Sequence, residues 1–140
     1  MSIRESVIED IVTVLKDMDD PKPVLVSREP FDVEKLAITQ FPAILVQSGT
    51  ETRADYNMNG RQGIIEYNIR AFVRGTELDR RKNSIVERIE ETLELNRRRL
   101  ANTYNIKTEI TEIEPISRLE PLGEVSITAQ VTYNYRRGTT

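Results

Sequence analysis

The last strand-like segment of the chain has a strict alternation of apolar and polar residues, and this pattern constrains the fold more than any other feature. From Val125 to Tyr135 every second residue is apolar, and the residues between them are uncharged: Ser126, Thr128, Gln130, Thr132 and Asn134. A period of two places these sets on opposite faces of a strand. Ile64–Arg74 alternates in a similar way. We expect these two strands to form the middle of one sheet with an apolar face.

Two segments with helical period can cover that face. Ser2 and Glu5 have the spacing of a capping box, and a wide stripe of apolar residues follows as far as Met18. Such a stripe is either enclosed by the core of its own domain or lies at a subunit boundary. The second helical segment runs from Glu77 to about Leu100.

Shorter apolar runs at Val24–Ser27, Ala43–Val46 and Ile106–Arg118 predict further strands. Two amphipathic helices with one sheet face to cover favour an α+β two-layer sandwich, in which two helices cover a mainly antiparallel sheet of about four to five strands. The chain has 140 residues, a common domain size, so we expect a single domain over residues 1–140.

The segment Glu51–Gly63 lies between two predicted strands and consists largely of polar residues. Asn59 and Gly60 both accept positive φ, which predicts a tight turn and therefore a hairpin arm that projects past the core. The tip carries Tyr56 and Met58, and arginines flank it at Arg53 and Arg61. We predict that these four residues contact a partner protein.

The chain contains no histidine and no cysteine. These residues carry much of the acid/base, nucleophilic and metal chemistry near neutral pH, so we expect a non-enzymatic protein without catalytic, cofactor-binding or metal-binding residues. A carboxylate-dependent enzyme is the remaining catalytic alternative. No apolar run approaches the roughly 20 residues of a membrane helix, and the N-terminus lacks the pattern of a signal peptide. We expect synthesis in the cytoplasm and no membrane partner.

Arg81, Arg88 and Arg99 return to nearly the same flank of the second helix at about 100° per residue. Such a strip suits phosphate binding, salt bridges to an acidic neighbouring subunit, or plain solvation. The segment Met1–Lys35 has five basic and nine acidic residues, a difference of −4, and the whole chain has a net charge of −3. A nucleic-acid-binding module is therefore an alternative, and subunit pairing through the three arginines is the preferred prediction.

A second group of charged residues is acidic and lies in the predicted strand before the last one: Glu109, Glu112 and Glu114. Counted in twos along a regular strand, Glu109 faces opposite to Glu112 and Glu114, which argues against a shared metal site. The pattern is typical of a polar strand face.

The order of these elements resembles the tail terminator proteins of tailed bacteriophages. The resemblance rests on the capped first helix, Phe41-Pro42-Ala43-Ile44 at the entry to a strand, and the long polar hairpin. It also rests on the amphipathic helix after Gly75 and on Leu122-Gly123-Glu124-Val125 before the alternating strand. It covers nearly the whole chain and includes no catalytic or metal motif.

The resemblance implies a structural virion protein, made and assembled in the host cytoplasm, that forms a homohexameric ring on the tail tube. The ring would stop tube polymerisation and offer its other side to the neck or head connector. The implied partners are the tail tube protein, a neck or connector protein and, in contractile tails, a sheath protein. DNA would pass through the lumen without specific binding, and Glu109, Glu112 and Glu114 are candidate lumen acids that would repel it. A neck or head-completion (head-tail joining) protein is the nearest alternative.

Overall fold

The centre of the molecule is a five-stranded sheet with the strand order β1-β2-β3-β5-β4. The computed structural model describes residues 2–55, 57–95 and 107–136. The strands are β1 (Leu25–Ser27), β2 (Ala43–Asp55), β3 (Gly60–Arg74), β4 (Lys107–Ile116) and β5 (Leu122–Arg136). β1 pairs parallel with β2, and the other neighbours pair antiparallel. The expected mainly antiparallel sheet is confirmed, with the two long alternating strands β3 and β5 side by side.

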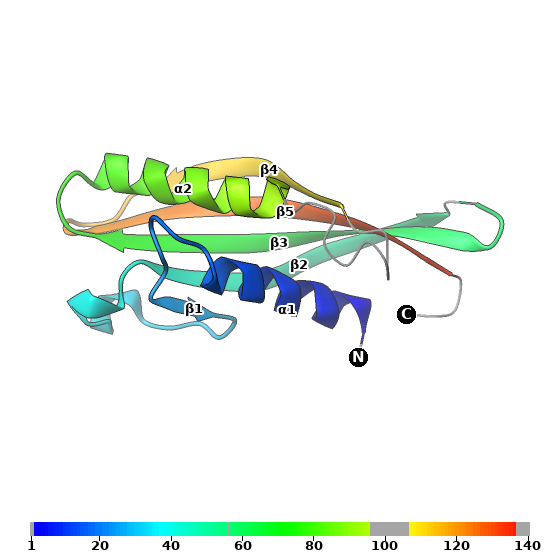
Figure 1. Cartoon of the computed structure of the whole chain (residues 1–140), viewed down its shortest axis with the longest axis horizontal. Coiled ribbons are helices and arrows are strands. Elements are labelled where there is room, and N and C mark those ends of the chain that lie inside the picture. Colours follow the sequence, from blue (N-terminus) through cyan, green and yellow to red (C-terminus); the bar gives the residue numbers. More distant parts are fainter. Residues whose placement is uncertain (1, 56, 96–106, 137–140) are drawn as a thin grey trace.

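Two helices, α1 (Ile3–Lys16) and α2 (Leu78–Leu95), cover one face of this sheet (Figure 1). The Ser2 Oγ accepts a hydrogen bond from the Glu5 amide at 3.1 Å, as the capping spacing predicted. The Glu5 carboxylate pairs with Arg28, whose Nη2 donates to Glu5 Oε1 at 2.9 Å. The α+β sandwich of a sheet and two helices is therefore the observed architecture.

The main core lies between the helices and the sheet and uses the wide apolar stripe of α1. Five side chains of α1 are buried there: Ile3, Val7, Ile8, Ile11 and Leu15. They meet three buried residues of α2, which are Ile85, Ile89 and Leu93, and the apolar face of β3 and β5. Each such side chain stabilises the fold by about 1.5–3 kcal/mol. Of the two readings of the stripe, the structure favours enclosure by the chain's own core.

A smaller core covers one end of the opposite sheet face. It consists of Val33, Ala43, Leu45 and Phe72, and two 3₁₀ turns, Val33–Lys35 and Ile38–Gln40, belong to the segment that covers it. β2 therefore begins with four residues that are buried on both faces of the sheet. We call the rest of this face, where the polar side chains of β5 lie, the open face.

The hairpin of β2 and β3 extends past the ends of both helices (Figure 1). β5 pairs with β3 as far as Gly60, which lies opposite Arg136. The projection therefore has three strands almost as far as its turn, so it continues the sheet of the body.

Candidate functional site

The turn of the hairpin carries an exposed methionine and is held by side-chain hydrogen bonds. The side chain of Met58 is 90% exposed. Asn57 Oδ1 accepts hydrogen bonds from the amides of Asn59 at 3.1 Å and Gly60 at 2.7 Å. Among the described residues positive φ occurs at Asp20, Glu77 and Gly75, so the predicted use of positive φ at Asn59 and Gly60 is wrong. An Asn side chain that bonds backbone amides makes the turn instead. Tyr56, predicted to lie at this tip, is outside the described residues.

The two arginines predicted to contact a partner are bound within the hairpin. Arg53 Nε lies 2.6 Å from Glu51 Oε2, and its guanidinium lies 5.2 Å from the centre of the Tyr135 ring. Arg61 Nε lies 3.3 Å from Asp55 Oδ1 on the opposite strand. Both arginines remain partly exposed. The Arg61–Asp55 pair lies next to the turn and the Arg53–Glu51 pair nearer the body, and Met58 is the most exposed predicted contact residue in the part of the hairpin described here.

Glu51 anchors the hairpin to the body, a role that its sequence pattern did not indicate. Its side chain is only 6% exposed, and Tyr133 donates its hydroxyl to Glu51 Oε2 at 2.6 Å. Arg4 of α1 approaches the same carboxylate at 3.4 Å. Burial and the hydrogen bond to Glu51 raise the pKa of Tyr133 above its usual range. The carboxylate thus joins α1, β2 and β5, far apart in the sequence, at the base of the projection.

The predicted arginine strip of α2 is not assembled among the described residues. Arg81 Nε donates to the Thr76 carbonyl at 2.7 Å, so its side chain folds back over the turn before the helix. Arg88 Nη1 binds Glu91 Oε2 at 3.1 Å, and its Nε donates to the Asp20 carbonyl at 3.2 Å. Arg99 lies outside the described residues. Arg81 and Arg88 both bind their own chain, and phosphate binding and subunit pairing both stay predictions.

The three acids of β4 lie on one sheet face. The prediction that Glu109 faces opposite to Glu112 and Glu114 is therefore wrong. Glu109, Glu112 and Glu114 lie opposite Gln130, Thr128 and Ser126, all on the open face. A register shift between Ile110 and Glu112 adds one residue to β4, so the alternation changes phase there. Glu109 binds Lys107 Nζ at 2.6 Å. A role in a lumen requires the three acids on a common surface, and that role stays a prediction.

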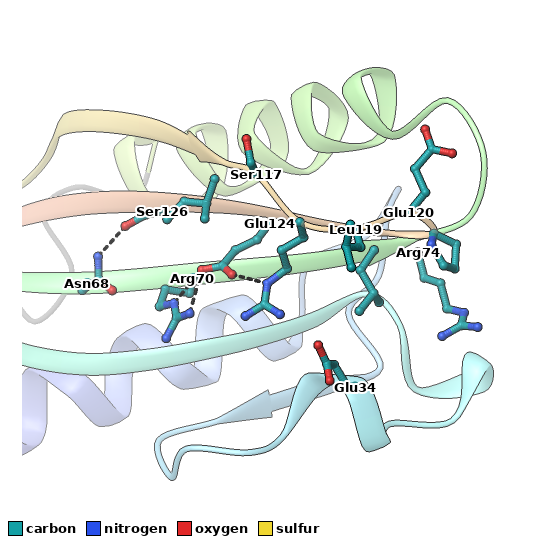
Figure 2. A pocket seen from close by; sticks show the side chains of 13 residues that line it. Glu34, Asn68, Arg70, Arg74, Ser117, Leu119, Glu120, Glu124 and Ser126 are labelled. Carbon is teal, nitrogen blue, oxygen red and sulfur yellow. Dashed lines mark hydrogen bonds and ion pairs between the residues drawn. The ribbon is translucent and has the colours of Figure 1, made fainter.

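A buried carboxylate on the open face was also missed by the sequence analysis. Glu124 is 1% exposed and lies between two arginines (Figure 2). Arg70 Nη2 lies 2.8 Å from Glu124 Oε2, and Arg118 Nε lies 2.6 Å from Oε1. Both guanidinium groups also lie over the Phe72 ring, at 5.3 and 5.5 Å from its centre. The only sequence evidence for the position of Glu124 was the alternation of β5, which places this residue on the polar face of the strand.

This cluster forms the wall of an open cavity of about 720 Å³ at the end of the sheet opposite the hairpin. Arg74 and Glu120 lie at its rim, and Asn68 donates to Ser126 Oγ at 2.8 Å beside it (Figure 2). Its carboxylates and arginines occur in equal numbers. Since Glu124 is paired on both oxygens, the cluster is suited to holding β3, β5 and the segment after β4 together.

No group of acidic side chains in the described part of the chain has the arrangement of a metal site. No helix within the described ranges is long and apolar enough to cross a membrane. The candidate contact surfaces are the hairpin tip, the open face and the end of the sheet opposite the hairpin, and their role stays a prediction.

Comparisons with known proteins identify a structural likeness. No protein-family model matches the sequence, and no curated protein matches it. Among solved structures, a chain from the virion of a native gene transfer agent particle is similar, with a TM-score of 0.53 and 10% sequence identity. The likeness covers 91% of this chain and 92% of that chain. The two chains therefore share a fold over nearly their whole lengths.

Proposed function

We propose that this chain is a structural protein of a phage-like virion and that it caps the tail tube as a ring. The observation that carries the proposal is the shared fold with a chain of the gene transfer agent virion, which extends over nearly all of both chains. The order of elements in the sequence, which resembles tail terminators, supports the same assignment independently.

In this proposal the ring ends tube polymerisation at one side and receives the neck or connector at the other. The hairpin tip is the surface for one of these partners. Met58 is highly exposed, and the Asn57 side chain holds the loop that carries it through hydrogen bonds to backbone amides. The tip can therefore bury apolar surface against a partner with little loss of conformational entropy. The ring is expected to be a homohexamer in the virion tail, assembled in the host cytoplasm, with DNA passing through its lumen and no catalytic step.

The test is an assembly assay with the tail tube protein of the same virus-like particle. Tubes polymerised with this chain should stop at a ring visible by negative-stain microscopy, and tubes without it should continue to lengthen. The double variant Tyr56→Ser, Met58→Ser should fold normally and bind tube ends at least about tenfold more weakly, corresponding to about 1.4 kcal/mol. Tubes of unchanged length in the presence of the native chain would contradict the capping role.

A neck or head-completion protein is the second candidate, because the same fold likeness and the same exposed tip support it. The two differ in the partner that the tip binds. A neck protein should bind the head connector and leave tube length unchanged, whereas a tail terminator should limit tube length. The candidates are separated by measuring tube length and binding to the head connector, each with the native chain and with the Met58→Ser variant.

A further inference from the structure

One side of β2 has no strand beside it for most of its length. β1 pairs only with residues 43–45 of β2, and β2 continues past it into the projecting hairpin (Figure 1). Residues 47–52 make no backbone hydrogen bond on this side to any described residue, and residues 48–50 are exposed. We call the outer side of residues 47–52 the β2 edge. Such an edge presents unpaired N–H and C=O groups to which another strand can bind.

A hydrogen bond at the start of β2 shows which backbone groups point outward. The Pro42 carbonyl accepts from the Val24 amide at 2.9 Å, so it points toward β1 and away from β3. Backbone groups two residues apart in a strand point to the same side. No register shift interrupts the pairing of β2 with β3 between Ala43 and Ser48. The N–H and C=O of Ser48 therefore also point outward.

Beyond a bulge, the outward groups continue at Glu51. A register shift follows Ser48, and the pairing with β3 resumes at Glu51. Ser48 lies opposite Tyr67 and Glu51 lies opposite Ile65, and these partners are two residues apart on β3. The backbone groups of Glu51 therefore point to the same side as those of Ser48. Two outward positions, unbonded on this side within the described residues, flank the bulge.

The opposite edge of the sheet, formed by β4, is protected. Glu94 of α2 accepts a hydrogen bond from the Ile110 amide at 3.0 Å, and a register shift follows Ile110. Glu112 and Glu114 add charges beyond the shift. Bulges, charges and covering groups hinder the addition of a strand. Residues 47–50 of β2 carry no charge, so the β2 edge is the better suited of the two to strand addition.

The side chains beside the β2 edge favour an acidic occupant. The Glu51 carboxylate is buried and is approached by Arg4 and Arg53, whose side chains are 60% and 36% exposed. The accessible charge on this face of the edge is therefore positive, and an acidic side chain complements it. On the other face, Gln47 and Thr52 are uncharged. Pairing with the same edge of a second copy would be a two-fold contact, which closes at two subunits and builds no ring.

We propose that an extended strand of the tail tube protein adds to the β2 edge in line with β1, with an acidic side chain beside Arg4 and Arg53. Its backbone bonds the outward groups of Ser48 and Glu51, and β1 already binds the start of β2 in this way. The inference rests on the proposed function, in which this chain ends the polymer of the tube protein. It names the kind of segment that the chain holds next to its hairpin.

Amide hydrogen exchange of the native chain, alone and mixed with the tail tube protein, tests the strand addition. In the free chain the amides of Ser48 and Glu51 should exchange faster than that of Gln47, which points toward β3. The tube protein should slow exchange at Ser48 and Glu51 at least about tenfold and change Gln47 little. Unchanged exchange at Ser48 and Glu51 would overturn the inference. Protection that instead grows with the concentration of the native chain alone would assign the edge to a second copy and overturn it too.

A proline variant gives a second readout. Ser48→Pro removes one outward N–H and keeps the bonds to β3, and edge strands tolerate proline at such a position. The variant should fold and should bind the tube protein at least about tenfold more weakly. Ser48→Thr keeps the N–H and is the matched control. Gln47→Pro should unfold the subunit more easily in urea, because it removes a bond to β3. Equal binding by Ser48→Pro and Ser48→Thr, or unfolding of Ser48→Pro, would overturn the inference.

Tube length separates the failure of this inference from the failure of the proposed function. Native chains that cap tubes without protecting the amides of Ser48 and Glu51 reject the strand addition and keep the capping role. Tubes that lengthen without limit while both amides are protected reject the capping role and keep the strand addition. Protection by the head connector, and not by the tube protein, rejects the assignment of the strand to the tube.

Discussion

Tyr133 connects the last strand to the hairpin through both its hydroxyl and its ring. The hydroxyl binds Glu51, and the side chain is fully buried in the main core, as is that of Tyr67. Burial is the main cause that raises the pKa of both tyrosines. A tyrosine in the unfolded chain ionises near pH 10. In both cases the folded state therefore holds its proton more tightly than the unfolded state.

The sign of the pH dependence follows from this difference. The stabilisation from a raised tyrosine pKa is fully present below about pH 10 and is lost as the pH rises through the folded-state pKa. The free energy of unfolding should therefore begin to fall as the pH rises past about 10 and should keep falling as the pH approaches the folded-state pKa. The fall should be shallower for Tyr133→Phe, as measured by urea denaturation along the pH range. Parallel curves for the native chain and Tyr133→Phe would show that this hydroxyl does not contribute.

Gly63 leaves room for the ring of the same tyrosine. A Cβ at this position would lie 2.5 Å from ring atoms of Tyr133, closer than real Cβ contacts allow. Gly63→Ala should destabilise the fold by about 1–3 kcal/mol, because the ring is buried and rigid and the core is already packed. Urea denaturation gives the magnitude. In a Tyr133→Val background the same substitution should cost clearly less, and an equal cost in both backgrounds would refute the steric explanation.

At the scale of single elements, local patterns predicted the long strands and not their irregularities. β3 and β5 alternate regularly along the stretch where each strand has one face on the main core, so a period of two was sufficient there. β4 is an edge strand, and its extra residue near Thr111 depends on how it pairs with β5. That pairing joins segments separated in sequence. A count along β4 alone therefore placed Glu109 on the wrong face.

The hairpin turn depends on one side chain. Asn57 Oδ1 accepts two backbone amides, and Asn57 N donates to the Gly60 carbonyl at 3.2 Å. Asn57→Ala should cost about 1 kcal/mol and should raise amide hydrogen exchange at Asn59 and Gly60. Asn57→Asp keeps the acceptor oxygen and is the matched control. Equal exchange rates in Asn57→Ala and the native chain would mean that the strands hold the turn without this side chain.

At the scale of the whole molecule, the sequence predicted the sheet, its helical cover and the hairpin, because each depends on a local period. The charged clusters depend on long-range pairing instead. Glu124 meets Arg70 from another strand, and Glu51 meets Tyr133 and Arg4. No periodicity indicates which acid will meet which arginine across a sheet. The candidate partner residues were predicted as exposed contacts, and the structure shows that four of them, Arg53, Arg61, Arg81 and Arg88, also bind their own chain.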